Sequence, residues 1–200
     1  MLMALKIHKA GVFVCLAMTL LGISEVNAAG IHMRDVICAL CGKKYSTPYP
    51  VQFLWHGIRL DFKPAGMNSP ALAVCPKCGY VQHAKYLSKA ESTKLRGYIQ
   101  SPEYKAMSNN HPSYYRLAKI YEVLGKNDLE LGFAYLRASW QEEQGGGKRD
   151  DEMRECLAYS LKHICAYLEN GPYDVKGASF VGCGGLNNYK IAQLLKAELL

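Results

Sequence analysis

The spacing of apolar residues separates a helical C-terminal part of the chain from an N-terminal part without helical periodicity. After His83, apolar side chains recur every three or four residues, the spacing that places them on one face of a helix. This pattern predicts helices over 84–100, 112–124, 127–144, 150–170 and from about 188 to 200, with a short helix opened by Ser101-Pro102-Glu103. We therefore expect a mainly α protein.

Capping signals mark the ends of these helices. Gly125 should end the helix over 112–124 in a left-handed conformation. Asn127 and Glu130 have the spacing of a capping box, and acidic residues open the helix at Asp150. The side chains at helical spacing, expected to face the core, are Tyr114, Leu117, Ala118, Tyr121, Leu124, Leu129, Phe133, Leu136, Trp140, Met153, Leu157, Leu161, Ile164 and Leu168.

Between Ile31 and His83 the pattern is typical of short strands and turns. Residues 51–55 and 58–62 are the strand candidates, joined around His56-Gly57. The segments on either side, 47–50 and 64–70, are rich in proline and are expected to form turns. This part has too few apolar residues for a large core of its own.

The first 28 residues have the pattern of a cleaved signal peptide. A basic start is followed by 13 apolar residues over 11–23, fewer than the ~20 that a membrane-spanning helix needs. Small residues at Val26 and Ala28 fit a signal peptidase site, so the mature chain would begin at Ala29. We expect export to the periplasm or outside the cell. The alternatives are an uncleaved anchor and a buried first helix.

Composition and charge narrow the classes of function. The chain of 200 residues is long enough for one domain, or for one domain with a small satellite, and 50% of its residues are hydrophobic. Its net charge is +7. Loss of the leader, which carries two lysines and one glutamate, leaves +6. The basic residues are scattered along the sequence, which disfavours nucleic acid as a partner.

Two copies of one cysteine motif carry the strongest chemical signal. Cys38-Ala39-Leu40-Cys41-Gly42 and Cys75-Pro76-Lys77-Cys78-Gly79 each place two sulfur atoms on one side of a tight turn, and 33 residues separate the copies. Two such knuckles together provide the four-sulfur tetrahedral set that a structural zinc ion prefers. We therefore predict one structural zinc ion bound by Cys38, Cys41, Cys75 and Cys78, in a zinc-ribbon-like module over 29–83.

Other uses of these cysteines stay open. In an oxidising compartment the pairs could close as disulfides, and a catalytic dithiol or an iron site would use the same residues. A glycine follows each pair and neither pair opens a helix, which disfavours the dithiol. Cys156 and Cys165 are nine residues apart on one predicted helix and so lie on opposite faces. Cys183 could form a disulfide with one of them.

The remaining residues offer little catalytic chemistry. His32 and His83 are close enough in sequence to approach the metal, but four cysteines already complete a zinc site. We find no Ser/His/Asp arrangement, no matched carboxylate pair, and no glycine-rich loop placed between a strand and a helix. The chain is therefore expected not to be an enzyme.

A faint repeat and a family resemblance complete the sequence picture. Residues 115–120 recur as 189–194, and the helix pair over 112–140 loosely resembles a tetratricopeptide hairpin. With the two knuckles, Arg59-Leu60-Asp61-Phe62 and the 111–118 stretch, the chain resembles an uncharacterised bacterial family. That family joins a zinc-ribbon-like head to tetratricopeptide-like helices, and its activity is unassigned.

The resemblance implies an architecture and leaves the biological role to inference. We expect a helical repeat-like domain over 84–200 that binds a protein or peptide in a groove lined by tyrosines. No membrane contact is expected after signal cleavage, and the C-terminal helix could join two copies of the chain. The alternative function is a thiol-disulfide redox protein that uses a CxxC pair, and zinc-ribbon binding to nucleic acid is a third, weaker hypothesis.

Overall fold

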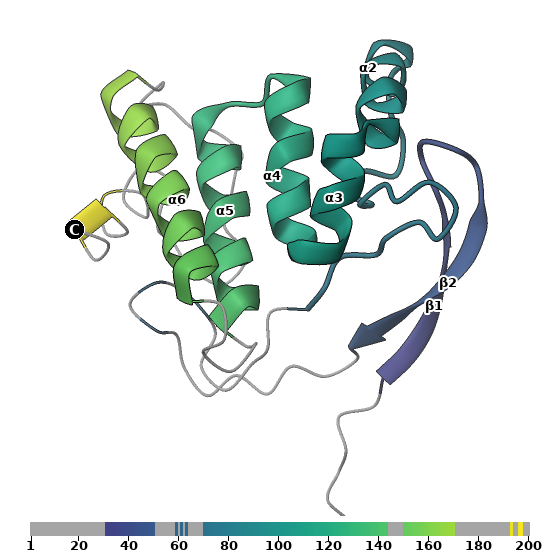
Figure 1. Cartoon of the computed structure of the whole chain (residues 1–200), viewed down its shortest axis with the longest axis horizontal. Coiled ribbons are helices and arrows are strands. Elements are labelled where there is room, and N and C mark those ends of the chain that lie inside the picture. The colour runs from purple at the N-terminus through teal and green to yellow at the C-terminus, as the bar shows by residue number, and fades with distance from the viewer. Residues whose placement is uncertain are drawn as a thin grey trace, which may run out of the picture. The chain divides into compact units, whose positions relative to one another are not determined.

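The computed structural model describes residues 31–50, 59, 61, 63, 70–143, 150–170, 193, 196 and 197. It is mainly helical, with one small antiparallel sheet near the N-terminus (Figure 1). The named elements are β1 (Ile31–Ile37), β2 (Lys44–Pro50), α2 (Lys89–Gln100), α3 (Pro102–Asn110), α4 (Ser113–Leu124), α5 (Asp128–Glu143) and α6 (Asp150–Asn170). The mainly α prediction is confirmed.

Several predictions fall outside the described residues. These are the signal peptide over 1–28, the strand over 51–55, most of the strand over 58–62, and Cys183. Of the last predicted helix, Gln193, Lys196 and Ala197 are described and are helical. No helix in the described part of the chain combines the length and the apolar character needed to cross a bilayer.

The hairpin of β1 and β2 corrects the expectation of a turn over 47–50. The Cys38 amide donates a hydrogen bond to the carbonyl oxygen of Lys43 at 2.9 Å, so these two residues form a hydrogen-bonded pair. Along an antiparallel ladder, hydrogen-bonded pairs alternate with pairs whose amide and carbonyl groups face away from the partner strand. Pro48 and Pro50 consequently lie at positions whose nitrogen faces away from β1. A proline costs no ladder hydrogen bond there, so a strand that ends in two prolines is compatible with the sheet.

Local capping explains the start of α2 and α3. The Ser88 side chain accepts a hydrogen bond from the Glu91 amide, and the Glu91 carboxylate accepts one from the Ser88 amide. The helix predicted over 84–100 therefore begins at Lys89, five residues later than expected. Ser101 caps α3 and Pro102 occupies its first turn, which confirms the predicted short helix.

The turn between α4 and α5 is as predicted. Gly125 ends α4 with a left-handed φ of 69°. Asn127 accepts a hydrogen bond from the Glu130 amide at 2.9 Å, and the Glu130 carboxylate accepts the Asn127 amide, so the capping box is confirmed. The three residues between the helices turn the chain back on itself, and α4 packs against α5.

A close crossing joins α5 to α6. A Cβ atom on Gly132 would lie 2.8 Å from Cγ1 of Ile164, so only glycine allows this approach. The Ser160 hydroxyl donates to the Gly132 carbonyl oxygen at 2.9 Å. The fully buried face of α6 consists of Cys156, Ser160, Ile164 and Tyr167. Of the five positions predicted for this face only Ile164 is fully buried. Apolar spacing did not identify Ser160, a polar residue that is buried because its hydroxyl bonds to α5 at the crossing.

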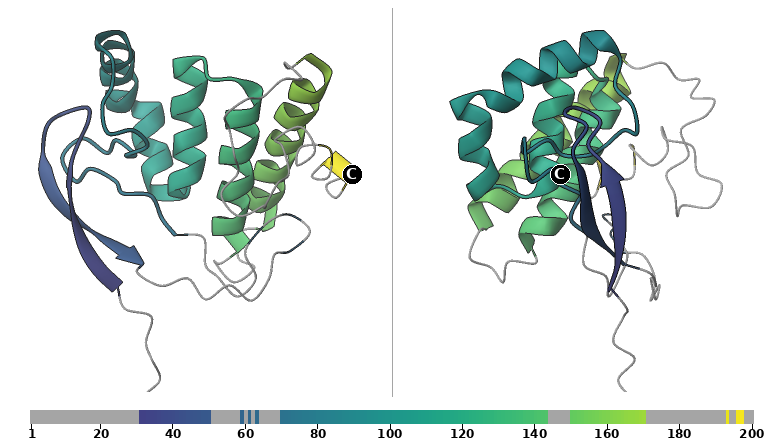
Figure 2. Two further views of the ribbon diagram at one scale, coloured as in Figure 1. Left: turned by 180° about the vertical axis from the view of Figure 1, so that it is seen from behind. Right: turned by 90° about the vertical axis from the view of Figure 1, so that its right-hand side faces the viewer.

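One hydrophobic cluster runs from the cysteine motifs into the helices. It contains Cys38 and Cys75 together with Leu95 and Ile99 of α2, Tyr104 of α3, and buried residues of α4, α5 and α6. Figures 1 and 2 show α4, α5 and α6 side by side, with the β1–β2 hairpin beyond α2 and α3. The cysteine motifs are therefore packed on the helices as part of one compact unit over residues 31–200.

Candidate metal centre

The two cysteine motifs have the same backbone hydrogen bonds. In the first, the Cys38 amide donates to Lys43 and the Gly42 amide donates to the Cys38 carbonyl oxygen, both at 2.9 Å. In the second, the Cys75 amide donates to Tyr80 at 2.9 Å and the Gly79 amide donates to the Cys75 carbonyl oxygen at 2.8 Å.

Both turns depend on their glycine. Gly42 and Gly79 have φ angles of 71° and 76°, in the left-handed region that other residues rarely adopt. The sequence prediction of two equivalent knuckles, each closed by its glycine, is confirmed.

The four sulfur atoms of the knuckles gather at one point. All lie within 4.8 Å of one another, and the structure records Sγ–Sγ distances of 3.7 Å for Cys38–Cys78 and 3.6 Å for Cys41–Cys75. A zinc–sulfur bond of about 2.3 Å gives a tetrahedron with edges of about 3.8 Å. Sulfur atoms joined in a disulfide lie about 2.05 Å apart. The four thiols are free and spaced to hold a metal ion of zinc's size.

Backbone amides point at the sulfur atoms, as predicted for these turns. Cys38 accepts from the amides of Leu40 and Cys41, Cys41 from the amide of Lys43, and Cys78 from the amide of Tyr80. Such hydrogen bonds stabilise thiolates, the form in which cysteine binds a metal.

Burial has the opposite effect on the pKa values, and the balance differs from one thiol to another. It raises the pKa values of Cys38 and Cys78. Burial also acts to raise the pKa of Cys41, but the Lys43 amide and the neighbouring cysteines outweigh it and bring that pKa to about 7. Deprotonation of all four thiols is therefore unfavourable without a cation, and a bound metal ion would supply the missing positive charge.

Three side chains from outside the knuckles hold their carbonyl and amide groups. Arg96 of α2 donates to the Leu40 carbonyl oxygen at 3.2 Å, and the Ala39 amide donates to Gln82 at 3.2 Å. The Tyr104 hydroxyl of α3 donates to the Gly79 carbonyl oxygen at 3.0 Å. Sequence reasoning did not identify these contacts, because they join residues 25 to 56 positions apart and no local motif marks them.

A buried arginine and a half-buried tyrosine belong to the surroundings of the knuckles. Arg116 of α4 is 8% exposed, and its positive charge acts to lower the pKa of Tyr104, the residue that holds the second knuckle. Tyr45 of β2 has its pKa raised to about 12 by burial and by the charge of Cys38, Cys75 and Cys78. Its buried hydroxyl has no hydrogen-bond partner among the described residues.

The histidines considered as ligands lie outside the sulfur group. His32 is exposed on β1. His83 is within hydrogen-bond distance of the Tyr80 hydroxyl, with Nδ1 2.9 Å from the oxygen, and its ring packs edge-on against Tyr121. The group of potential metal ligands contains only the four cysteines. The assignment of the histidines to supporting or surface positions therefore agrees with the structure.

The other described cysteines take no part in the centre. Cys156 is buried and Cys165 is half-buried on α6. Nine residues of helix separate them, which places them on opposite faces. The proposed pairing with Cys183 concerns a residue outside the described range.

A second group of titratable side chains connects α4, α5 and α6. The Tyr135 hydroxyl, on a fully buried ring, donates to Glu122, and Glu122 also pairs with Lys119 at 3.1 Å. Tyr135 stacks on Tyr159 and on His163, and His163 lies 2.7 Å from a carboxylate oxygen of α5. The charged side chains of this group are paired with one another, so we interpret the group as a set of contacts that holds the three helices together.

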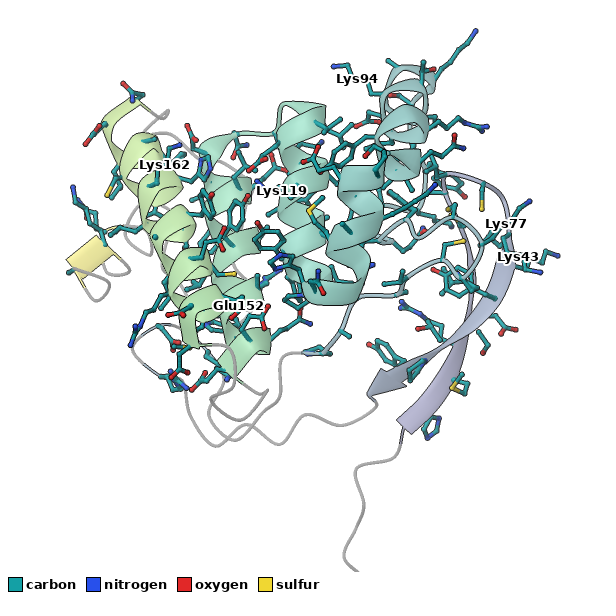
Figure 3. All side chains as sticks on the ribbon, viewed as in Figure 1. Lys43, Lys77, Lys94, Lys119, Glu152 and Lys162 are labelled. Carbon is teal, nitrogen blue, oxygen red and sulfur yellow. The ribbon has the colours of Figure 1, made fainter. Side chains whose placement is uncertain are left out.

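Lysines surround the exposed side of the knuckles. Lys43 follows the first glycine, Lys77 lies inside the second motif, and both side chains are exposed. Figure 3 shows both side chains at the edge of the molecule near the β1–β2 hairpin, directed away from the helices. Four thiolates with one divalent cation carry a net charge of −2, so these ammonium groups would partly offset the charge of a loaded site.

Comparisons with protein-family models, with curated proteins and with solved structures return no match for this chain. The function must therefore be argued from the site itself.

Proposed function

We propose that the chain is a zinc-binding protein in which Cys38, Cys41, Cys75 and Cys78 hold one structural zinc ion. The observation that supports this most directly is the spacing of the four sulfur atoms, all within 4.8 Å of one another on two equivalent knuckles. Zinc is favoured over harder cations because every ligand is a thiolate. All four positions are filled by protein, which is the arrangement of a structural site and leaves none for a substrate.

The role of the metal follows from the packing around it. The knuckles share one hydrophobic cluster with α2, α3 and α4, and their carbonyl groups are held by Arg96 and Tyr104. A zinc ion would fix the turn of the β1–β2 hairpin against the second knuckle and these helices. Metal binding would thereby contribute to the free energy of folding.

We further propose that the protein is exported and acts as a non-catalytic module that binds a protein or peptide. The basic and apolar pattern of residues 1–28 supports export. The α4–α5 hairpin with its tight turn, and the close packing of α5 on α6, support a helical-hairpin array of the tetratricopeptide kind. Such arrays characteristically present binding surfaces.

A thiol-disulfide redox protein is the second candidate. The half-buried thiol of Cys41 has a pKa of about 7, in the range of reactive cysteines, although burial alone would raise it. A redox role predicts rapid alkylation of this single thiol at pH 6. A zinc site predicts slow alkylation of all four thiols until a chelator removes the metal.

The test is a count of metal and thiols on the same sample. The full chain is purified without added metal, its zinc content is measured by mass spectrometry, and the thiols are titrated before and after chelation. We expect one zinc ion per chain and four thiols that react only after chelation. A metal-free protein, or one with a single reactive thiol that a chelator leaves unchanged, would refute the zinc assignment.

A further inference from the structure

A groove of about 740 Å³ runs beside the first knuckle. One wall is formed by residues 34–39, the end of β1 and the start of the knuckle, and the other by residues 82–87. No residue of β2 lines it, so the groove lies on the side of β1 that faces away from its partner strand. A hydrogen bond from the Ala39 amide to Gln82 joins the two walls at one end.

The backbone of β1 is unpaired along this groove. Because Cys38 and Lys43 form a hydrogen-bonded pair, the alternating ladder turns the amide and carbonyl groups of Met33, Asp35 and Ile37 away from β2. None of the hydrogen bonds between described residues uses these groups. An unpaired strand edge of this kind is a template for a further strand.

The opposite wall offers similar contacts. Residues 85–87 lie outside any helix or strand, and their amide groups have no backbone partner among the described residues. Two large apolar side chains are exposed near the groove, Ile37 on one wall and Tyr86 on the other, with 58% and 77% of their surface accessible. A chain lying between the walls could therefore pair with backbone on one side and cover apolar surface on both.

Two basic side chains line the groove, Arg34 and Lys85, against one acidic side chain, Asp35. The two segments that form its walls carry further basic side chains. Residues 31–49 and 70–89 contain one acidic side chain, Asp35, against six basic ones, and all of these are exposed. The basic side chains are Arg34, Lys43, Lys44, Lys77, Lys85 and Lys89. Even a zinc site of charge −2 leaves this surface positive. These basic residues are scattered along the sequence because they belong to two separate segments, which only the fold brings together.

We propose that this groove binds an acidic peptide segment in extended conformation, which adds to the free edge of β1 as a third strand. The inference rests on the proposed function as an interaction module and names its surface and the chemistry of its partner. Main-chain hydrogen bonds would supply affinity and the surrounding lysines would select for acidic side chains. A second copy of the chain is a poor occupant, since its own β1 edge is equally basic. Nucleic acid lacks the regularly spaced amide and carbonyl groups that an unpaired strand edge recognises.

The chain offers a matched pair of variants for the test. Asp35 and Ser46 face each other in the ladder, and both direct their amide groups away from the hairpin, Asp35 toward the groove and Ser46 toward the opposite edge. Proline at either position removes one outward amide and keeps the pairing of β1 with β2, as Pro48 already does. Asp35→Pro also removes a negative charge, which by electrostatics alone would strengthen the binding of an acidic peptide.

The experiment selects peptides from a displayed library of random decapeptides on the zinc-loaded full chain. The most enriched peptide is then titrated against the wild type and both variants by fluorescence anisotropy, with a ten-nucleotide oligothymidylate as competitor. We expect acidic, proline-poor peptides, binding about fivefold or more weaker for Asp35→Pro, and no change for Ser46→Pro. Binding should also weaken as salt is raised.

The outcomes are separable from those of the zinc assignment. If one zinc ion per chain is present and no peptide is enriched, or the two proline variants bind equally, the groove proposal is wrong and the metal site stands. Stronger binding of the oligothymidylate than of any peptide would assign the basic surface to nucleic acid and overturn the proposal. A preparation without zinc refutes the metal assignment, whatever the peptides do.

Discussion

The hydroxyl group of Tyr104 donates a hydrogen bond to the carbonyl oxygen of Gly79, the left-handed glycine that closes the second knuckle, at 3.0 Å. Tyr104 is 1% exposed, so this contact lies inside the hydrophobic cluster that joins the knuckles to the helices. The buried Arg116 side chain of α4 acts on the pKa of the same tyrosine by its charge. Tyr104 of α3 thus fixes the position of the turn that closes the second knuckle.

Replacement of Tyr104 by phenylalanine should loosen the second knuckle. The variant leaves the Gly79 carbonyl without this donor, which we expect to cost about 1–2 kcal/mol of the free energy of unfolding. Zinc should also be lost to a competing chelator at a lower chelator concentration. Tyr98→Phe is the control, because its ring packs against Tyr104 at 5.4 Å but its hydroxyl has no hydrogen bond among the described residues. Equal effects of the two variants would show that the hydroxyl contact does not matter.

The knuckle glycines should tolerate no side chain. Gly42→Ala places a Cβ atom on a residue with φ of 71°, and although the surrounding space is open, we expect a loss of about 1–2 kcal/mol from the backbone alone. Gly97→Ala, inside α2 and also in open space, should instead stabilise the protein by about 1 kcal/mol. Urea unfolding of the zinc-loaded proteins measures both. A neutral Gly42→Ala variant would contradict the left-handed turn.

The crossing of α5 and α6 should be sensitive to a single methyl group. Gly132→Ala would place its Cβ 2.8 Å from Cγ1 of Ile164 and 3.4 Å from the Ser160 carbonyl oxygen. Alanine is the better helix former, yet we expect a net loss of about 1–3 kcal/mol, because the two helices must separate to admit it. The thermal unfolding midpoint should fall, whereas that of Gly97→Ala should rise. A rise for both variants would refute the close crossing.

His83 should make stability depend on pH in the weakly acidic range. Burial holds the pKa of this imidazole below its ordinary value of about 6.5, and Lys126 acts in the same direction. The unfolded chain therefore takes up a proton more readily than the folded one, so the contribution is complete above about pH 6.5 and is lost as the pH falls below it. Unfolding free energies between pH 7.5 and 5.5 should show a shallower decline for His83→Gln than for the wild type. A variant of the exposed His32 provides the control, and an unchanged slope for His83→Gln would count against the burial argument.

Features that depend on a few neighbouring residues could be predicted from the sequence. The left-handed turns at Gly42, Gly79 and Gly125 and the Asn127–Glu130 capping box are set by residues within a few positions of one another. The approach of the two knuckles to each other was predictable too, because two equally spaced cysteine pairs together supply the four ligands of one metal ion.

Features that depend on distant parts of the chain could not be predicted in the same way. The strand at 44–50 depends on its pairing with β1, in which both prolines fall at positions whose nitrogen faces away from the partner strand. The start of α2 is an exception, because the Ser88–Glu91 capping box that sets it is local and was overlooked in favour of apolar periodicity. The contacts of Arg96 and Tyr104 with the knuckles join distant residues without any local pattern. The positive surface beside β1 likewise exists only once residues 31–49 and 70–89 are brought together.

The most direct test of the central claim is X-ray absorption at the zinc edge on the purified full chain. We predict four sulfur ligands at about 2.3 Å and no nitrogen or oxygen ligand, because Cys38, Cys41, Cys75 and Cys78 form the whole donor set. A first shell that includes nitrogen from a histidine, or a protein that binds no zinc and holds the same cysteines as disulfides, would contradict the account.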